Sequence, residues 1–484
     1  MLFNSLEFLI FFPIVTLLFF LLPHRFRWFH LLVASCIFYM FFIPVYIFIL
    51  FLTIIIDYIA GILIENTKGR KRKLYLIISL ISNIGVLAIF KYFNFFIDNT
   101  NELLYSIGIT TTSSYLPILN IILPIGLSFH TFQAMSYTIE VFRGNQKAEH
   151  HFGIYALYVM FYPQLVAGPI ERPQNVLHQF HERHYFSRQN LIDGLRLMLW
   201  GLFKKVVIAD RAAQYVNIVY GNPENYHYLN LVIATLLFSI QIYCDFSGYS
   251  DMALGAAKTM GFDLTVNFRR PYFAKNIQDF WSRWHISLST WFRDYLYIPL
   301  GGNRKGVIKR YMNTILVFVV SGFWHGANWT FLIWGALHAV LVSGHMFLNK
   351  HFKKPEKKEL KLASLNLPSV LCTFLLVSFT WIFFRAENWT DAKLIVDRIF
   401  SLYDQQSFLL VVKDQFNQAE SGMTALLISI SMVAVMFWVE SLLDPTLIKI
   451  NKKPTFDILF IATILTLIIS FGAFQKTSFI YFQF

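Results

Sequence analysis

Long apolar runs separated by short polar segments make up most of the chain. A helix needs about 20 apolar residues to cross about 30 Å of hydrocarbon, and about eleven runs approach that length. They are predicted to be membrane-spanning helices: Leu6–Leu22, Phe29–Phe42, Val45–Ile64, Leu74–Ile97, Leu116–Phe132, Leu191–Ala209, Leu229–Leu254, Phe331–Leu348, Pro368–Phe384, Thr424–Leu443 and Ile458–Phe474. The pattern predicts a single all-α domain over residues 1–484, with shorter re-entrant and interfacial helices beside the spans.

The basic residues predict the orientation of these spans. Lys and Arg collect in short clusters between the apolar runs, as in KGRKRK at residues 68–73, and such clusters stay on the cytoplasmic side of a membrane. Counting spans from the clusters places both termini outside the cytoplasm. The same count makes the polar stretch 385–422 an extracytoplasmic loop, and residues 475–484 form a separate aromatic tail. We therefore expect a multi-pass protein of the cell (inner) membrane with extracytoplasmic ends.

Composition narrows the class of protein. Hydrophobic residues make up 56% of the chain and charged residues 14%, whereas soluble proteins carry about 25% charged residues. This excludes a soluble globular protein and a disordered chain. The net charge of +13 does not indicate a nucleic-acid partner, because the basic residues lie in short loops and not on one face of a domain. The three cysteines lie in separate apolar runs, and we expect no metal and no bound cofactor.

The segment from Asp279 to Asn303 is the densest in candidate chemistry. It reads DFWSRWHISLSTWFRDYLYIPLGGN, in which Trp and Tyr are interspersed with arginines and one histidine, His285. One interpretation is an amphipathic helix at the membrane interface, where aromatic residues gather and Asp279 pairs with Arg283 one turn later. The other is the entrance for a phosphate-bearing ligand. The residues assigned to that entrance are Arg283, Trp284, Arg293, Arg304 and Lys305.

A second candidate is SGFWHGANWT, residues 321–330. The apolar stretch from Tyr311 to His325 has 15 residues, about 22 Å of helix, so His325 is expected to stop short of the far side of the membrane. Ionisable side chains at membrane depth usually face a cavity. A neutral histidine suits a general base, and Gly322 and Gly326 would let a substrate approach it closely. The alternative is a buried structural histidine.

Two aspartates also lie inside an apolar run. YCDFSGYSDMALG, residues 243–255, contains Asp245 and Asp251. We expect them to fix polar packing and not to react.

Several motifs in one order resemble the membrane-bound O-acyltransferase family, and within it the bacterial branch of alginate and peptidoglycan O-acetyltransferase membrane subunits. The resemblance covers nearly the whole chain and rests on PIGLSFHTFQAMSYTIEVFRG, FYPQLVAGPIERP, FWSRWHISLSTWFRDYLYIPLGGNR, SGFWHGANWT and FRAENWTDA. It implies helices around a central tunnel that is open to an acyl donor on the cytoplasmic side and to an acceptor on the other. It places the invariant histidine of the family on His325 and its second motif histidine on His285, and it assigns Trp324 and Asn328 to the donor tunnel.

The resemblance also implies the chemistry. Acetyl-CoA would enter from the cytoplasm with its phosphates near Arg304 and Lys305. His325 would act as general base on an acceptor hydroxyl that attacks the thioester. His285 would stabilise the oxyanion or orient His325. The final acceptor would be an exported cell-surface polysaccharide of the alginate or peptidoglycan type.

The last six residues, FIYFQF, resemble the terminal motif of a small companion protein in the teichoic-acid D-alanylation system. By that analogy Tyr481 would carry the acetyl group transiently, with His325 as its base. It would pass the group to a secreted or membrane-anchored SGNH or esterase-like acetyltransferase partner. The alternative is an aromatic anchor in contact with membrane lipid.

Other functions stay open on the sequence alone. The same chemistry would also serve transfer of D-alanyl or another acyl group to a teichoic-acid-like polymer. A transporter or flippase would move its substrate without covalent change and would not depend on His325. A scaffold for an export complex would depend on the outer loop and not on the histidines. The leading interpretation is O-acetyl transfer to an exported polysaccharide.

Overall fold

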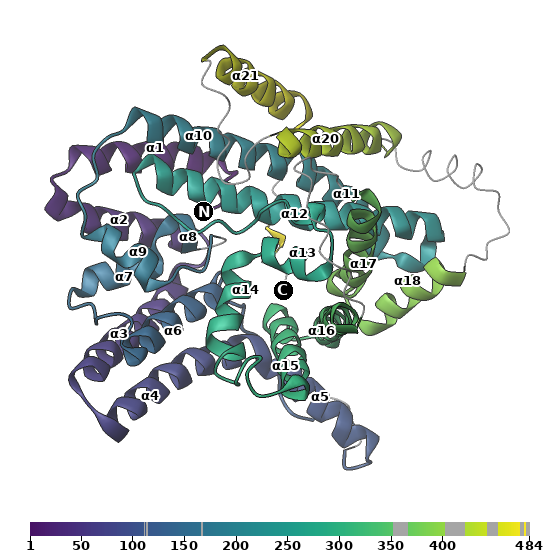
Figure 1. The fold of residues 1–484 in the computed structure, drawn as a ribbon, viewed down its shortest axis with the longest axis horizontal. Helices are drawn as coiled ribbons and strands as arrows, with labels where there is room; N and C mark the ends of the chain where they lie inside the picture. The colour runs from purple at the N-terminus through teal and green to yellow at the C-terminus, as the bar shows by residue number, and fades with distance from the viewer. Residues whose placement is uncertain are drawn as a thin grey trace. The chain divides into compact units, whose positions relative to one another are not determined.

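The computed structural model describes residues 1–110, 112, 115–165, 168–351, 366–401, 422–442, 454–474 and 479–480. All regular elements within these ranges are helices, so the predicted all-α class is confirmed (Figure 1). Helices long and apolar enough to cross a membrane occur at Pro44–Asn66, Gly69–Ser106, Tyr228–Thr259, Trp329–His351 and Leu367–Arg385. Shorter apolar helices lie at Leu6–Leu21, Leu427–Ser441 and Ile458–Phe471. The protein is a multi-pass membrane protein.

The chain forms two compact units. Unit 1 comprises residues 1–195 and 252–265, and unit 2 comprises residues 196–251 and 266–484. The helices of unit 1 are α1 (Leu6–Leu21), α2 (His24–Met40), α3 (Ile47–Asn66), α4 (Gly69–Leu87), α5 (Phe93–Ser106), α6 (Leu127–Arg143), α7 (Phe152–Met160), α8 (Tyr162–Leu165) and α9 (Pro173–Val176). Residues of both units occur in α10 (Arg188–Phe203) and α12 (Tyr228–Thr259).

The helices of unit 2 carry most of the candidate chemistry. They are α11 (Asp210–Gly221), α13 (Ile277–Arg283), α14 (Ile286–Phe292), α15 (Val307–His325), α16 (Trp329–His351), α17 (Leu367–Arg385), α18 (Trp389–Ser401), α20 (Gly422–Leu442) and α21 (Pro454–Phe471). Two short π-helical segments interrupt the α-helices of this unit, η4 (Lys204–Ala209) and η7 (Arg293–Tyr297). Such segments occur often at functional sites.

Helices α3, α4 and α6 of unit 1 pack around a buried carboxylate. The Ser79 hydroxyl donates to Asp57 Oδ1 at 2.6 Å, and Asn83 Nδ2 donates to Asp57 Oδ2 at 2.8 Å. A carboxylate removed from water is stable only when it is paired in this way. In a loop of the same unit, the fully buried Glu171 accepts hydrogen bonds from the amide and the hydroxyl of Thr265.

The predicted span Leu116–Phe132 is wrong in its first part. The backbone from residue 115 to 126 is not helical, and α6 begins only at Leu127. Pro117 and Pro124 give the physical reason, because proline lacks an N–H group and disfavours helical geometry in the residue before it.

Asparagine side chains of α5 satisfy the backbone of this non-helical segment. Asn101 accepts from the Leu116 amide at 2.8 Å and donates to its carbonyl at 3.0 Å. Asn94 holds Leu119 in the same way, at 2.8 and 2.9 Å. Paired side-chain amides thus replace the hydrogen bonds that a helix would make internally.

The stretch expected to be a polar loop, residues 385–422, contains a helix, α18. Asn388 caps its start, since its Oδ1 accepts from the Asp391 amide at 2.9 Å, and Ile395 buries its apolar side. Residues 402–421 lie outside the described residues. The extracytoplasmic position of the loop stays a prediction.

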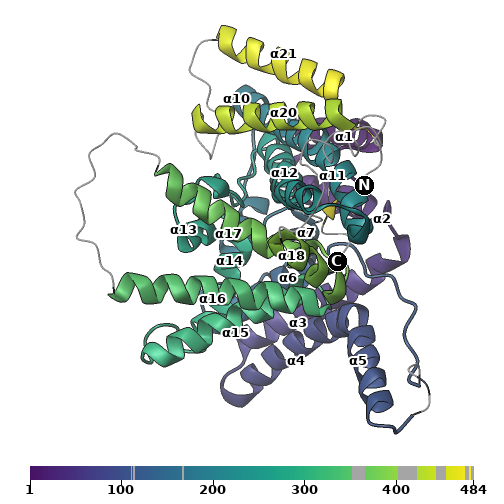
Figure 2. The ribbon, with the colours of Figure 1, turned by 90° about the vertical axis from the view of Figure 1, so that its right-hand side faces the viewer.

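Helices α15 and α16 make the closest helix pair of unit 2 and run side by side (Figure 2). Glycines make this possible. A Cβ atom on Gly322 would lie 2.2 Å from the carbonyl oxygen of Phe331, and one on Gly335 would lie 2.3 Å from that of Phe318. Small residues let membrane helices approach until their backbones touch.

Candidate active site

His325 is the last residue of α15 and is only 5% exposed. Its ring lies against three aromatic rings, with centroid distances of 4.9 Å to Trp324, 5.1 Å to Trp334 of α16 and 5.2 Å to Phe384 of α17. The helix begins at Val307 and has 19 residues, about 28 Å. The expected length of 15 residues is therefore too short, and burial in protein, not helix length, is what separates His325 from water.

The glycines on either side of this histidine do not open a path for a substrate. A Cβ atom on Gly326 would lie 2.1 Å from the ring of Phe331, and Gly322 faces the Phe331 backbone. The space is filled by α16. The expectation of a close approach beside these glycines is therefore wrong, because the glycines serve helix packing.

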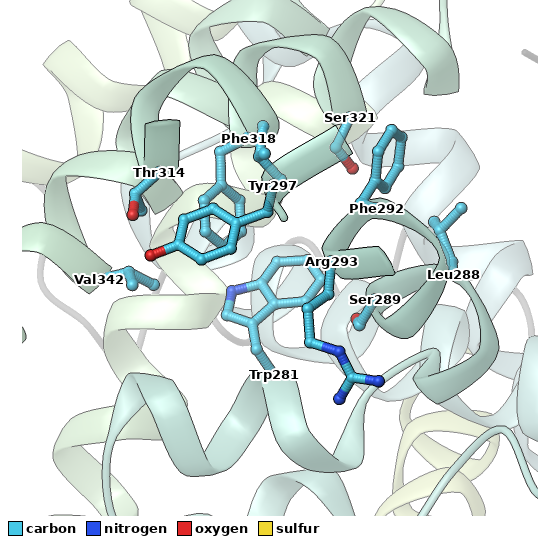
Figure 3. A pocket seen from close by; sticks show the side chains of 11 residues that line it. Trp281, Leu288, Ser289, Phe292, Arg293, Tyr297, Thr314, Phe318, Ser321 and Val342 are labelled. Carbon is cyan, nitrogen blue, oxygen red and sulfur yellow. The ribbon is translucent and has the colours of Figure 1, made fainter. Parts of the chain in front are cut away.

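A cavity of about 210 Å³ lies within unit 2, beside α15 (Figure 3). Its wall combines aromatic rings with hydroxyl groups and one guanidinium, which suits a ligand with both apolar and polar parts. Ser321 lines it one helical turn before His325, and the exposed Arg293 lines it from η7. The lining residues are Trp281, Leu288, Ser289, Phe292, Arg293, Tyr297, Thr314, Val317, Phe318, Ser321 and Val342.

A second buried histidine, His338 of α16, supports the wall of this cavity. The indole Nε1–H of Trp281 donates to His338 Nδ1 at 3.3 Å, so Nδ1 carries no proton. His338 Nε2 lies 2.9 Å from the Thr380 hydroxyl, which itself donates to the Val377 carbonyl at 2.7 Å. Nε2 is therefore the protonated nitrogen. This hydrogen-bond network assigns a neutral tautomer to His338.

Aromatic contacts connect His338 to His325. The ring of Trp334 lies 4.8 Å from His338 and 5.1 Å from His325. The indole of Trp281, which lines the cavity, lies 6.0 Å from Trp334. Because interiors are close-packed, we expect a change at His338 to affect both the cavity wall and His325.

His285 stands between α13 and α14 and is fully buried. Its backbone has φ of +42°, a left-handed conformation that is uncommon for a residue other than glycine. Its ring meets Phe246 edge-on at 4.6 Å and lies 6.4 Å from Phe268, with the two ring planes inclined by 29°. Burial lowers the pKa of His285 to about 3, so its imidazole is neutral at pH 7. Strained backbone of this kind clusters at functional sites.

Trp284 links the two predicted histidines. Its ring lies 5.1 Å from Phe268, which neighbours His285, and 5.2 Å from Trp381. Trp381 stacks on Trp334 at 5.6 Å, and Trp334 contacts His325. One continuous aromatic cluster thus contains both histidines.

The other predicted residues have more local roles. Arg283 pairs with Asp279 at 2.7 Å, as the spacing predicts. Arg304 and Lys305 are exposed in the turn before α15. Asn328 caps α16, since its Oδ1 accepts from the Thr330 amide at 3.1 Å. Tyr481 lies outside the described residues.

A buried ionic network surrounds the π-helical segment η4. Lys204 Nζ lies 2.5 Å from Asp251 Oδ2, and Lys205 Nζ lies 2.7 Å from Asp245 Oδ1 and 2.8 Å from Asp210 Oδ1. Asp245 and Asp251 thus make polar packing contacts, as expected from the sequence.

The sequence interpretation overlooked His338 and the lysines of η4. Each lies within a predicted span, His338 in Phe331–Leu348 and the lysines in Leu191–Ala209. An ionisable side chain inside a span is by itself a sign of a functional or paired site, and this signal would have found them.

These features define a helical membrane protein with an amphipathic cavity, whose lining residues Ser321 and Trp281 connect it to the buried His325 and His338. The chain belongs to the membrane-bound O-acyltransferase family, whose family model matches residues 17–385, and it is an O-acyltransferase. It is 36% identical over 402 residues to a peptidoglycan O-acetyltransferase from Helicobacter pylori, an alignment that covers 77% of this chain and 73% of that protein.

Other relatives carry related names. A probable alginate O-acetylase AlgI from Pseudomonas aeruginosa is 37% identical over 406 residues, which cover 83% of this chain and 75% of that protein. A teichoic acid D-alanyltransferase from Bacillus subtilis is 30% identical over 250 residues, which cover 49% of this chain and 62% of that protein. The resemblance stated from the motifs is confirmed.

Proposed function

We propose that the protein transfers acetyl groups from acetyl-CoA to an exported polysaccharide, with His325 as general base. The names of the H. pylori and P. aeruginosa relatives support an O-acetyl group and a polysaccharide acceptor. The observation that carries the proposal is the position of His325. It is buried, and it ends the helix whose Ser321, one turn earlier, lines the cavity.

The reaction proposed for His325 is the first acyl transfer, from the thioester to an acceptor hydroxyl. The acceptor hydroxyl gives its proton to a ring nitrogen of His325 while its oxygen bonds to the thioester carbonyl carbon. The C–S bond then breaks, and the sulfur leaves with the proton from the imidazolium, which yields an acetate ester and free CoA. A positioned base typically contributes 10²- to 10⁴-fold to such a step. His285, neutral and buried, donates a hydrogen bond to the oxyanion or orients His325.

The donor is proposed to enter from the cytoplasmic side of the inner membrane. The amphipathic lining of the cavity suits the acyl-pantetheine arm, and Arg293 lies where charge-assisted hydrogen bonds would hold polar groups of the donor. The exposed Arg304 and Lys305 offer positive charge to the CoA phosphates.

The acetyl group is proposed to leave on the extracytoplasmic side, where both termini lie in this orientation. Tyr481 takes the acetyl group first and passes it to a secreted or membrane-anchored SGNH or esterase-like partner, which esterifies the polymer. Transfer of a D-alanyl group is the second candidate. The B. subtilis relative favours it, although that match covers only 49% of this chain.

The test uses the purified full chain in lipid nanodiscs with acetyl-CoA labelled in its acetyl group. CoA release and label on the protein are measured for the wild type, His325→Ala and Tyr481→Phe. His178→Ala is the matched control, because His178 is exposed. We expect His325→Ala to abolish both signals, Tyr481→Phe to abolish the label, and the control to retain both. Turnover that persists in His325→Ala would refute the assigned base, and turnover only with a D-alanyl thioester would favour the second candidate.

A further inference from the structure

Helix α12 binds a segment from the far end of the sequence. The amide of Ile480 donates a hydrogen bond to Asp245 Oδ2 at 2.7 Å, although the two residues are 235 positions apart. Phe479 is 0% exposed and Ile480 is 2% exposed. The ring of Phe479 lies 4.5 Å from Tyr249 and 5.7 Å from Phe246. The segment 479–480 is therefore inserted into the protein interior and does not lie on its surface.

The carboxylate that binds this segment is held in place by a lysine. Lys205 Nζ lies between Asp245 Oδ1, at 2.7 Å, and Asp210 Oδ1, at 2.8 Å. One carboxylate oxygen of Asp245 is thus committed to the ammonium group, and the other points to the Ile480 amide. Buried charges persist only when they are paired and hydrogen-bonded, and here the backbone amide of the segment completes the pairing.

A second contact brings the same end of the chain to η4. The Ala473 amide donates to the Val206 carbonyl at 2.8 Å, and Arg211 Nε donates to the Phe471 carbonyl. Val206 follows Lys205 directly within the π-helical segment. The end of α21 is thus bound to η4 and α11, next to Lys205, and Lys205 pairs with the aspartate that binds Ile480.

The inserted segment lies beside His285. Phe246, the residue after Asp245 on α12, contacts the ring of Phe479 at 5.7 Å and the ring of His285 at 4.6 Å. One aromatic ring therefore separates the segment from a histidine of the candidate active site. We name Lys205, Asp210, Asp245, Phe246 and Tyr249 the tail-docking cluster.

We propose that the tail-docking cluster is a specific intramolecular binding site that holds residues 479–480 beside His285, so that the segment forms part of the reaction site. Asp245 is a positioning residue, because it acts through the segment and does not touch the reacting atoms. The role of residues 479–480 in the reaction rests on the proposed acetyl transfer. The binding of these residues to the tail-docking cluster does not depend on that proposal.

The docking is tested by the accessibility of a thiol introduced at position 480. Ile480→Cys is introduced into the full chain with Cys36→Ser and Cys372→Ser, and the rate of maleimide labelling is measured in nanodiscs. The buried Cys244 is retained. We expect slow labelling with Asp245 intact. Asp245→Ala should accelerate labelling roughly ten- to hundredfold, the factor expected when one hydrogen bond to a charged group is lost.

Matched variants separate docking from general destabilisation. Asp251 lies on the same helix as Asp245 and pairs with Lys204 of η4. Asp251→Ala breaks this neighbouring ion pair and should leave the labelling rate unchanged. Phe479→Ala leaves α12 intact and should accelerate labelling as Asp245→Ala does, which covers the case in which Asp245→Ala does not fold. Equal rates in the Asp245, Phe479 and parent proteins would overturn the docking. Equal acceleration by Asp251→Ala would overturn its specificity.

The activity measurement addresses the place of the segment in the reaction. With acetyl-CoA as donor, Phe479→Ala and Asp245→Ala should lower kcat at least tenfold and leave the KM for acetyl-CoA within about twofold, since the donor cavity is not changed. If variants whose thiol at position 480 has become accessible keep the full kcat, the segment is not part of the reaction site. Absence of turnover in the wild type would refute the proposed function, and the labelling rates would still decide the docking.

Discussion

Replacing Gly335 by alanine should separate α15 from α16 and disturb His325. The added Cβ atom would lie 2.3 Å from the Phe318 carbonyl oxygen and 3.1 Å from its carbon, against an ordinary contact distance of at least 3.4 Å. Both atoms belong to the backbone, so the helices must move apart by about 1 Å. Overpacking of this kind costs about 1–3 kcal/mol of unfolding free energy. The neighbouring Trp334 would move with its helix, and its contact with His325 would loosen.

The chain supplies a matched control on the same helix. A Cβ atom on Gly344 of α16 meets nothing within 4 Å. Gly344→Ala should therefore stabilise the protein by about 0.5–1 kcal/mol through the higher helix propensity of alanine. The assay is the unfolding free energy of both variants in the same detergent, together with CoA release. If Gly335→Ala is as stable as Gly344→Ala, the close backbone contact does not determine the helix packing, and the reasoning fails.

Three further predictions concern single side chains. His338→Phe deprives the buried Trp281 N–H of its acceptor and should cost about 1–3 kcal/mol in thermal unfolding; an unchanged midpoint would contradict the assigned hydrogen bond. His285→Gly should be more stable than His285→Ala by about 1 kcal/mol, because glycine adopts a positive φ without strain. Both variants should lose acetyl transfer. Equal unfolding midpoints of the two variants would argue against backbone strain at this position. Burial raises the pKa of Glu171 from its ordinary value of 4.5 to about 7, so the folded state binds the proton more tightly. Stability should therefore fall between about pH 4.5 and 7, and Glu171→Gln should flatten this dependence in unfolding measured against pH.

The sequence predicts the helices well where apolar runs are long and uninterrupted. Hydropathy alone fails at residues 115–126, where Asn94 and Asn101 of α5 supply hydrogen bonds that a helix would make internally. Prolines in a run mark such places, and here they should outweigh hydropathy.

The candidate site is predictable in its parts but not in its connections. His325 lies in a buried aromatic setting, and Arg293 lines the cavity; both belong to motifs selected from the sequence, and their roles stay predictions. The pairing of Lys205 with Asp245 joins residues 40 positions apart, and the Ile480 contact uses a backbone amide that any residue but proline possesses. Neither contact follows from residue type or spacing, because both depend on how the helices fold together.

His338 and His325 both contact Trp334, but the assigned tautomer of His338 leaves it unable to accept a further proton without losing a hydrogen bond. Nδ1 of His338 is occupied by an indole donor and Nε2 by a hydroxyl acceptor, so neither nitrogen is available to a molecule that reaches the cavity. A water molecule that enters along Trp281 meets an imidazole that does not activate it. This wall of the cavity therefore supplies no general base to a water molecule.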